Sequence, residues 1–144
     1  MPTMSTPTIA TGPRAPLSRS VLALVDQAHT VLREADRADT PGERFRLAHL
    51  AALRTAAAVL AERARPSRGP RRLRSAWALI DATAPEFSDW AAYFASGAAK
   101  REAIESGAFN VVSGREADDL VRAAGDFLTL VETSMGLLVE PLAS

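Results

Sequence analysis

The segment TPGERFRLAHLAALRTAAAVLAERA (residues 40–64) decides the fold class. It begins with Thr40, an N-cap residue, followed by proline at the first helical position and by Glu43 three residues after the cap. This order predicts a helix start with a capping box. Residues 45–64 are apolar around most of a helical circumference, so neighbours must cover the helix on several sides. We therefore expect it at the centre of a helical bundle.

The same apolar periodicity predicts further helices on both sides of this one. They cover about residues 17–38, a short stretch after an arginine-rich loop at about 65–72, about 85–107, and 113 to about 136, where Ser113 and Glu116 form a second capping box. The only β-branched candidate for a strand, Phe109–Val112, is too short to build a sheet. The sequence thus predicts an all-α antiparallel bundle of four long helices and one short helix.

The composition describes one globular domain. The 144 residues are 47% hydrophobic and 24% charged, which is a normal balance for a folded chain. We expect a disordered, Pro- and Thr-rich tail at residues 1–16, the bundle at 17–136, and a loosely packed tail at 137–144. Lysine and arginine together number 17, as do aspartate and glutamate, so the chain is neither globally basic nor globally acidic.

Several site classes are excluded by the same sequence. Without cysteine there is no disulfide, no thiolate metal site and no cysteine nucleophile. No apolar run approaches the roughly 20 residues of a membrane span, and the N-terminus lacks the pattern of a secretory signal. We therefore expect a soluble, cytoplasmic protein with no membrane contact. No phosphate-binding glycine loop, nucleophile elbow or dinucleotide fingerprint occurs, and we expect no cofactor.

The first candidate site is the pair Arg44 and His49. An arginine can hold a phosphate bidentately and a histidine can move a proton near neutral pH, which is the chemistry of phosphodiester cleavage. On one helix these residues lie about 140° apart, whereas Arg46 lies closer to the His49 face and could substitute for Arg44. His49 also projects among apolar positions. Both a core histidine and a ligand or interface histidine remain open interpretations.

The second candidate site is a cluster of arginines between the second and third predicted helices. Because the whole chain is neutral, the rest of it carries a net negative charge, and the cluster polarises the molecule. Such a patch attracts phosphate backbones through counterion release. A solvated loop is the alternative interpretation, since arginine occurs 16 times and lysine once. The six candidates for RNA or phosphate binding are Arg63, Arg65, Arg68, Arg71, Arg72 and Arg74.

Two other groups are better explained by structure than by chemistry. Asp26 and His29 have the i, i+3 spacing of di-metal bundles, but His49 is preceded at that distance by Arg46, so we predict no metal site. The aromatic residues between positions 77 and 94 have helical spacing, which favours core packing over a cofactor pocket. Arg101 falls on the same helical face as this group. The aromatic residues are Trp77, Phe87, Trp90, Tyr93 and Phe94.

Four blocks in order give the chain a family resemblance. The stretches GERFRLAHLAALRTAAAVLAERARP (42–66), SAWALI (75–80), WAAYFASGAAKREAIESG (90–107) and SGREADDLVRAAGDFLTLVE (113–132) resemble small stand-alone actinobacterial proteins of the SAV-type HEPN subfamily. The resemblance implies a bundle of four to five helices, often dimeric. It also implies either a metal-independent ribonuclease with an R-x4-6-H motif, or a module that binds RNA, a nucleotide or a protein partner.

The resemblance leaves three hypotheses. Arg44 and His49 alone match R-x4-H, and they would be the catalytic pair of a ribonuclease. Two departures favour a non-catalytic binding module for RNA, a nucleotide or a protein partner. Phe45 stands where active members of the family usually have a polar residue, and the motif lies on an earlier helix than usual. The third hypothesis is a structural partner protein without nucleic-acid contact. An all-round apolar second helix also predicts a homodimer.

Overall fold

The computed structural model describes residues 16–63, 75–108 and 110–138. Every regular element in these ranges is helical, and the order is α1 (Arg19–Arg37), α2 (Pro41–Glu62), α3 (Ala76–Thr83), a 3₁₀ turn η1 (Pro85–Phe87), α4 (Ser88–Ala95), α5 (Ala98–Glu105) and α6 (Gly114–Ser134). The predicted all-α bundle is confirmed. The predicted tails at 1–16 and 137–144 lie almost entirely outside the described residues and stay predictions.

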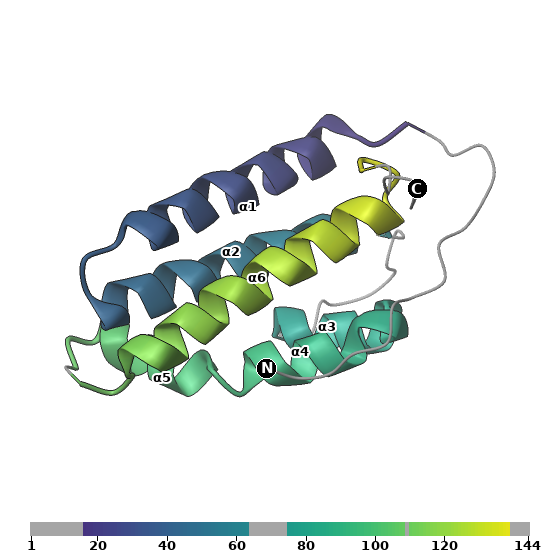
Figure 1. Ribbon diagram of the computed structural model, residues 1–144. Helices are drawn as coiled ribbons and strands as arrows, with labels where there is room; N and C mark the ends of the chain where they lie inside the picture. The colour runs from purple at the N-terminus through teal and green to yellow at the C-terminus, as the bar shows by residue number, and fades with distance from the viewer. Residues whose placement is uncertain (1–15, 64–74, 109, 139–144) are drawn as a thin grey trace, which may run out of the picture.

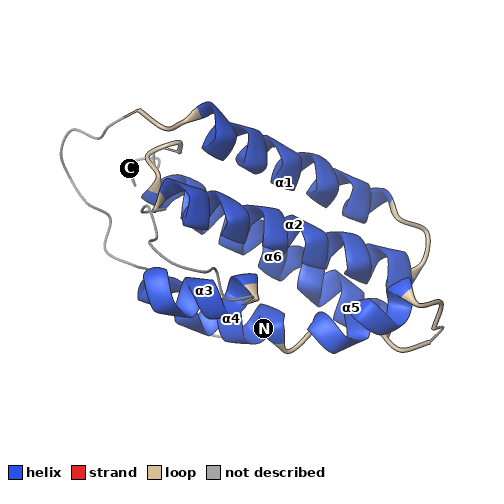
Figure 2. Cartoon of the chain, turned by 180° about the vertical axis from the view of Figure 1, so that it is seen from behind, coloured by secondary structure: helices blue, strands red, loops and turns tan. Residues whose placement is uncertain are grey.

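The three long helices, α1, α2 and α6, lie side by side, with α3, α4 and α5 along the opposite side of α2 and α6 (Figure 1). Helix α1 runs antiparallel to α2, while α2 and α6 run in the same direction. Seen from behind, α4 and α5 follow one another under the long helices, and α3 packs beside α4 (Figure 2). Helix α2 contacts α1, α6, α3 and α5, so it is the central helix that its apolar sequence predicts.

Small side chains let α2 approach its neighbours closely. Four of its alanines, Ala48, Ala52, Ala56 and Ala58, have no exposed surface. The larger core side chains come from the short helices and from α6. Phe87, Phe94 and Phe127 are completely buried, and Trp77 stacks on Phe94 with ring centroids 5.1 Å apart. The predicted packing of the aromatic group into the core is confirmed for Trp77, Phe87, Trp90 and Phe94.

The helix ends follow the sequence signals closely, with one exception at the start of α2. The Thr40 hydroxyl accepts from the Glu43 amide, as predicted, but the Glu43 carboxylate bonds to Arg46 instead of returning to the cap. At α6 both halves of the capping box form between Ser113 and Glu116. The predicted capping box at Thr40 is therefore only half formed, because a guanidinium one turn later competes for the carboxylate.

The predicted continuous helix over residues 85–107 is interrupted, and this is the main correction to the sequence-based fold. A 3₁₀ turn precedes α4, and the helix breaks again at Ser96 and Gly97 before α5 begins. Glycine lowers helix stability, and the Ser96 hydroxyl bonds to the Tyr93 carbonyl 2.6 Å away. Gly97 also lies against the ring of Phe45, where a Cβ would come within 3.3 Å of Cζ. The break allows this close approach.

Candidate functional site

His49 lies on α2 and faces the break between α4 and α5. The residue has no exposed surface, and its Nε2 is 2.9 Å from the Phe94 carbonyl oxygen. In a continuous helix that carbonyl would accept the amide four residues later. Because the helix breaks at Ser96 and Gly97, the carbonyl instead accepts from the Gly97 amide and from His49. The break therefore supplies the partner that lets a polar ring be buried here.

The hydrogen bond defines the protonation of the imidazole. A carbonyl only accepts, so the proton resides on Nε2, and Nδ1 has no hydrogen-bond partner among the described residues. Burial lowers the pKa of His49 because it penalises the charged ring, and the Phe94 carbonyl opposes this only in part. The Arg101 guanidinium lowers the pKa further, while Glu105 raises it. His49 is thus held in its neutral form.

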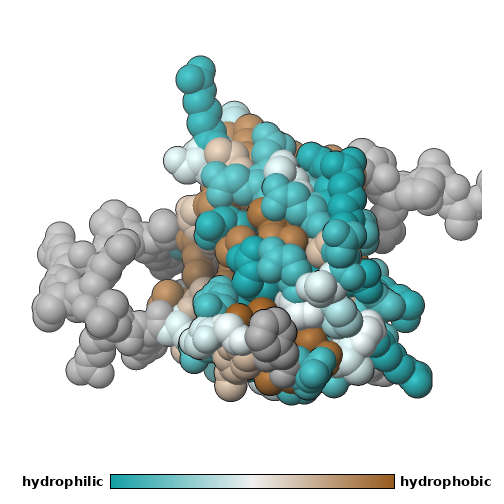
Figure 3. All heavy atoms as spheres, turned by 90° about the vertical axis from the view of Figure 1, so that its left-hand side faces the viewer, coloured by the Kyte–Doolittle hydropathy of each residue, from teal (hydrophilic) through white to brown (hydrophobic). Residues whose placement is uncertain are grey.

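Arg44, the other half of the R-x4-H match, extends to a different part of the bundle. Its Nη1 lies 2.6 Å from Oδ1 of Asp118 on α6, and its Nη2 donates to the Ala38 carbonyl at 3.1 Å. These contacts join the start of α2 to α6 and to the turn after α1. The end of the bundle where α2 and α6 begin is mostly hydrophilic (Figure 3). The structure does not bring Arg44 and His49 together.

Arg46, the possible substitute for Arg44, pairs within its own helix. Its Nε and Nη2 donate to the two carboxylate oxygens of Glu43, at 3.0 and 2.5 Å. This bidentate hydrogen bond lowers the pKa of Glu43 and raises the pKa of Arg46. The arginine that acts most directly on His49 is instead Arg101 of α5. Its Nη1 bonds to Glu105 at 2.9 Å, and its buried Nε has no hydrogen-bond partner in residues 16–63, 75–108 and 110–138.

Only the first residue of the arginine cluster lies in the described residues. Arg63, at the C-terminal end of α2, forms an ion pair with Glu86, and its guanidinium lies over the Phe87 ring, 5.7 Å from the centroid. These contacts tie the end of α2 to η1. The other five candidates, Arg65, Arg68, Arg71, Arg72 and Arg74, lie outside the described residues.

The sequence did not predict the contact between His29 of α1 and Glu132 of α6. His29 Nε2 lies 2.8 Å from Oε1 of Glu132, a residue that is only 7% exposed. The sequence did contain a signal for this contact, because the acidic residue Glu132 falls four residues after Leu128 on the buried stripe of α6. An acid at such a position needs a partner from a neighbouring helix. Asp26 is exposed, and the described residues contain no group of three or more metal-ligating side chains.

One of three comparisons with known proteins gives a match. A family model described as SAV_6107-like HEPN matches residues 35–132, which span α2 to the last turn of α6. Comparison with curated proteins and with solved structures finds nothing similar. The matched range includes both halves of the R-x4-H match and the whole arginine cluster.

Proposed function

Since the chain belongs to the SAV_6107-like HEPN family, we propose that it is a non-catalytic binding module of the HEPN type. The supporting observation is the position of His49, which has no exposed surface and uses Nε2 on the Phe94 carbonyl. A general acid or base must come within hydrogen-bond reach of the proton that it transfers. This ring meets that requirement only if α4 and α5 move away from α2.

The state of Arg44 supports the same proposal. A phosphate-binding arginine presents its fork of donors to the ligand, whereas both Nη atoms of Arg44 are used by Asp118 and by the Ala38 carbonyl. The alternative, a metal-independent ribonuclease that uses Arg44 and His49, requires both side chains to be released. The bundle would then lose the hydrogen bonds from Arg44 to α6 and from His49 to α4.

Among ligands for the module, charge favours RNA. Arg63, Arg65, Arg68, Arg71, Arg72 and Arg74 give six positive charges in twelve residues of a neutral chain. Phosphate contacts of arginine release counterions and position a nucleic acid without reading its sequence. A protein partner without nucleic-acid contact is the other candidate, and RNA-binding measurements separate the two.

The test is RNA binding and cleavage at several salt concentrations. Wild-type protein should shift a labelled single-stranded RNA in low salt and leave it intact. Replacing Arg68, Arg71 and Arg72 by alanine should weaken binding similarly for all RNA sequences, and should reduce the slope of log affinity against log salt by about 2. A matched control replaces Arg33, Arg115 and Arg122, which removes the same charge from α1 and α6.

The outcomes separate the three hypotheses. Equal loss of affinity in the control would show that net charge, not the cluster, attracts the RNA. Cleavage by the wild type that disappears in His49→Ala with an unchanged melting temperature would establish the ribonuclease instead. Neither a shift nor cleavage would leave the protein-partner module.

Helix α2 supports the further proposal of a homodimer. It keeps a partly exposed apolar strip despite its central position, and such strips mark association surfaces. The strip consists of Leu50, Leu53, Ala57 and Leu60.

Within the described residues no helix is long and apolar enough to cross a membrane. The cytoplasmic location stays a prediction.

A further inference from the structure

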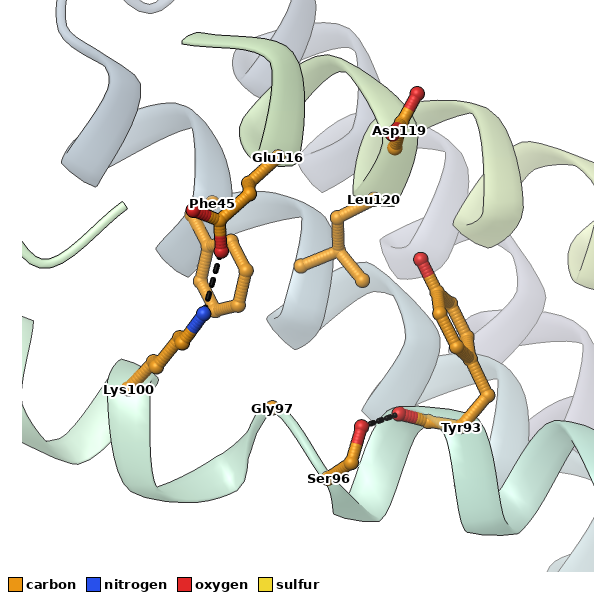
Figure 4. A pocket seen from close by; sticks show the side chains of 8 residues that line it. All are labelled: Phe45, Tyr93, Ser96, Gly97, Lys100, Glu116, Asp119 and Leu120. Atoms are coloured by element: carbon orange, nitrogen blue, oxygen red, sulfur yellow. Dashed lines mark hydrogen bonds and ion pairs between the residues drawn. The ribbon is translucent and has the colours of Figure 1, made fainter. Parts of the chain in front are cut away.

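A pocket of about 260 Å³ lies between α6 and the junction of α4 and α5 (Figure 4). Its back is apolar, and one wall is the ring of Tyr93, which stands with its hydroxyl toward α6. Charged side chains from α5 and α6 occupy the mouth. The lining residues are Phe45, Tyr93, Ser96, Gly97, Lys100, Glu116, Asp119 and Leu120.

The pocket is a consequence of the helix break. In a continuous helix, a residue with a side chain at position 97 would press against the Phe45 ring. Because Gly97 has no side chain, the Phe45 ring forms the back of the pocket. Phe45 is 5% exposed and Leu120 is 3% exposed, so this back wall belongs to the core and is rigid. A rigid apolar back with a few polar groups at the mouth is typical of small-ligand sites.

The charges at the mouth do not cancel. Lys100 Nζ lies 2.5 Å from Oε2 of Glu116, so these two groups neutralise each other across the opening (Figure 4). Asp119, half-buried and one turn farther along α6 than Glu116, points away from Lys100 (Figure 4) and has no hydrogen-bond or ion-pair partner in the part of the chain that the structure describes. Burial raises the pKa of Tyr93, and the negative charge of Asp119 raises it further. The negative charge of Asp119 therefore acts on the Tyr93 side chain, which forms one wall of the pocket.

We propose that this pocket binds an organic cation, an ammonium or guanidinium group on an apolar stem. The cation lies between Asp119 and the Tyr93 ring, where a carboxylate and an aromatic face both attract positive charge. The stem lies against Phe45 and Leu120. An anion is disfavoured because the one cationic side chain at the mouth is already paired. A neutral ligand would strip water from the Asp119 carboxylate without replacing it.

Two sources can supply this chemistry, a free amine or the side chain of a lysine or arginine from a protein partner. The inference does not depend on RNA binding, because no residue of the arginine cluster lines the pocket. The chain has a single tyrosine. The ring signals of Tyr93, observed by NMR after selective tyrosine labelling, therefore report on the pocket without interference.

The probes are phenethylammonium and its neutral counterpart 2-phenylethanol. Phenethylammonium should shift the Tyr93 signals in a saturable way, and 2-phenylethanol should bind at least several-fold more weakly. Asp119→Asn should weaken phenethylammonium binding about two- to fivefold, as expected for one carboxylate and one cation–π contact near the surface. Lys100→Gln should strengthen it, because Glu116 loses its competing cation. Asp126→Asn, which removes the same charge from an exposed position of α6, should change nothing.

Equal binding of the two probes, or unchanged affinity in Asp119→Asn, would overturn the proposal. The source of the cation is resolved by a pentapeptide with one central lysine between glycines, compared with the same peptide carrying glutamine. Binding of the lysine peptide with an affinity above that of phenethylammonium indicates a partner side chain. Binding of phenethylammonium alone indicates a free amine. Failure of both cations to shift Tyr93 refutes the site.

Discussion

His49 combines complete burial with one satisfied and one unsatisfied ring nitrogen. As a core residue, its replacement by alanine should lower the free energy of unfolding by about 1 to 3 kcal/mol. Because burial lowers its pKa in the folded state, the unfolded chain binds a proton at this site at higher pH than the folded chain does. The contribution of the neutral His49 ring to the free energy of unfolding is therefore complete above about pH 6.5. It is lost as the pH falls below that value.

Urea denaturation between pH 7.5 and pH 5 checks this prediction. His49→Gln should show a flatter dependence of unfolding free energy on pH than the wild type, and His29→Gln should keep the His49 contribution. The window stays above the range in which Glu43 and Glu116 titrate, because their hydrogen bonds lower both carboxyl pKa values below 4.5. An unchanged pH dependence in His49→Gln would contradict the assignment.

At this scale, sequence reasoning predicted local partners and missed distant ones. The N-cap bonds of Thr40 and Ser113 follow from spacing along one helix, and both form. The Phe94 carbonyl is 45 residues away from His49 and becomes available only because a helix breaks. No periodicity in α2 contains that information. The same holds for Asp118, which meets Arg44 across 74 residues.

At the scale of elements, two glycines that look alike in the sequence have opposite roles. Gly125 lies in the middle of α6, where an added Cβ would meet only Leu32 Cδ2, at an ordinary contact distance of 3.6 Å. Gly97 ends the break between α4 and α5, where a Cβ would press on Phe45 at 3.3 Å and lie 3.6 Å from His49 Cδ2. Phe45 is buried and cannot move aside freely.

Alanine at these positions should therefore shift stability in opposite directions. Gly125→Ala should raise the unfolding free energy by about 0.5 to 1 kcal/mol, because it removes the entropic cost of glycine inside a helix. Gly97→Ala should lower it by about 1 kcal/mol through overpacking. Chemical denaturation of the two variants beside the wild type measures both. Stabilisation by Gly97→Ala would mean that a continuous helix fits here, and the account of the break would be wrong.

The helix ends were the easiest part of the elements to predict, and the break was the hardest. Gly107 and Gly136 end α5 and α6 with positive φ angles of 94° and 77°, a conformation that glycine adopts without strain. The predicted ends at about Gly107 and Gly136 are consistent with this. A glycine inside an apolar pattern, such as Gly97, is compatible with either a continuous or a broken helix. Packing against α2 decides between them.

At the scale of the whole molecule, the surrounding helices do not cover the central helix α2 completely. Helix α2 is enclosed by α1, α6, α3 and α5, yet one strip stays partly exposed. The spacing of Leu50, Leu53, Ala57 and Leu60 places all four on one helical face. The sequence predicted this arrangement in outline, because an all-round apolar helix needs neighbours on every side. Which side stays open depends on how the short helices pack.

This strip is expected to join two copies of the chain. Light scattering at micromolar concentration should give twice the mass of a single chain, which is 15.3 kDa. Introducing glutamate at both Leu50 and Ala57 should give the mass of one chain, because two buried charges would face their own copies in a symmetric interface. These positions lie outside the hydrophobic core cluster, so circular dichroism should show an intact fold.

Leu22→Glu is the control, since it places one glutamate on α1, at a leucine that is 39% exposed. It should leave the dimer intact, because Leu22 lies outside the strip. Dissociation by Leu22→Glu, with the Leu50 and Ala57 variant still dimeric, would move the interface to α1. A wild type with only the single-chain mass at every concentration tested would refute the dimer. The exposed strip would then be available to a different protein, and the module would bind its partner as one copy.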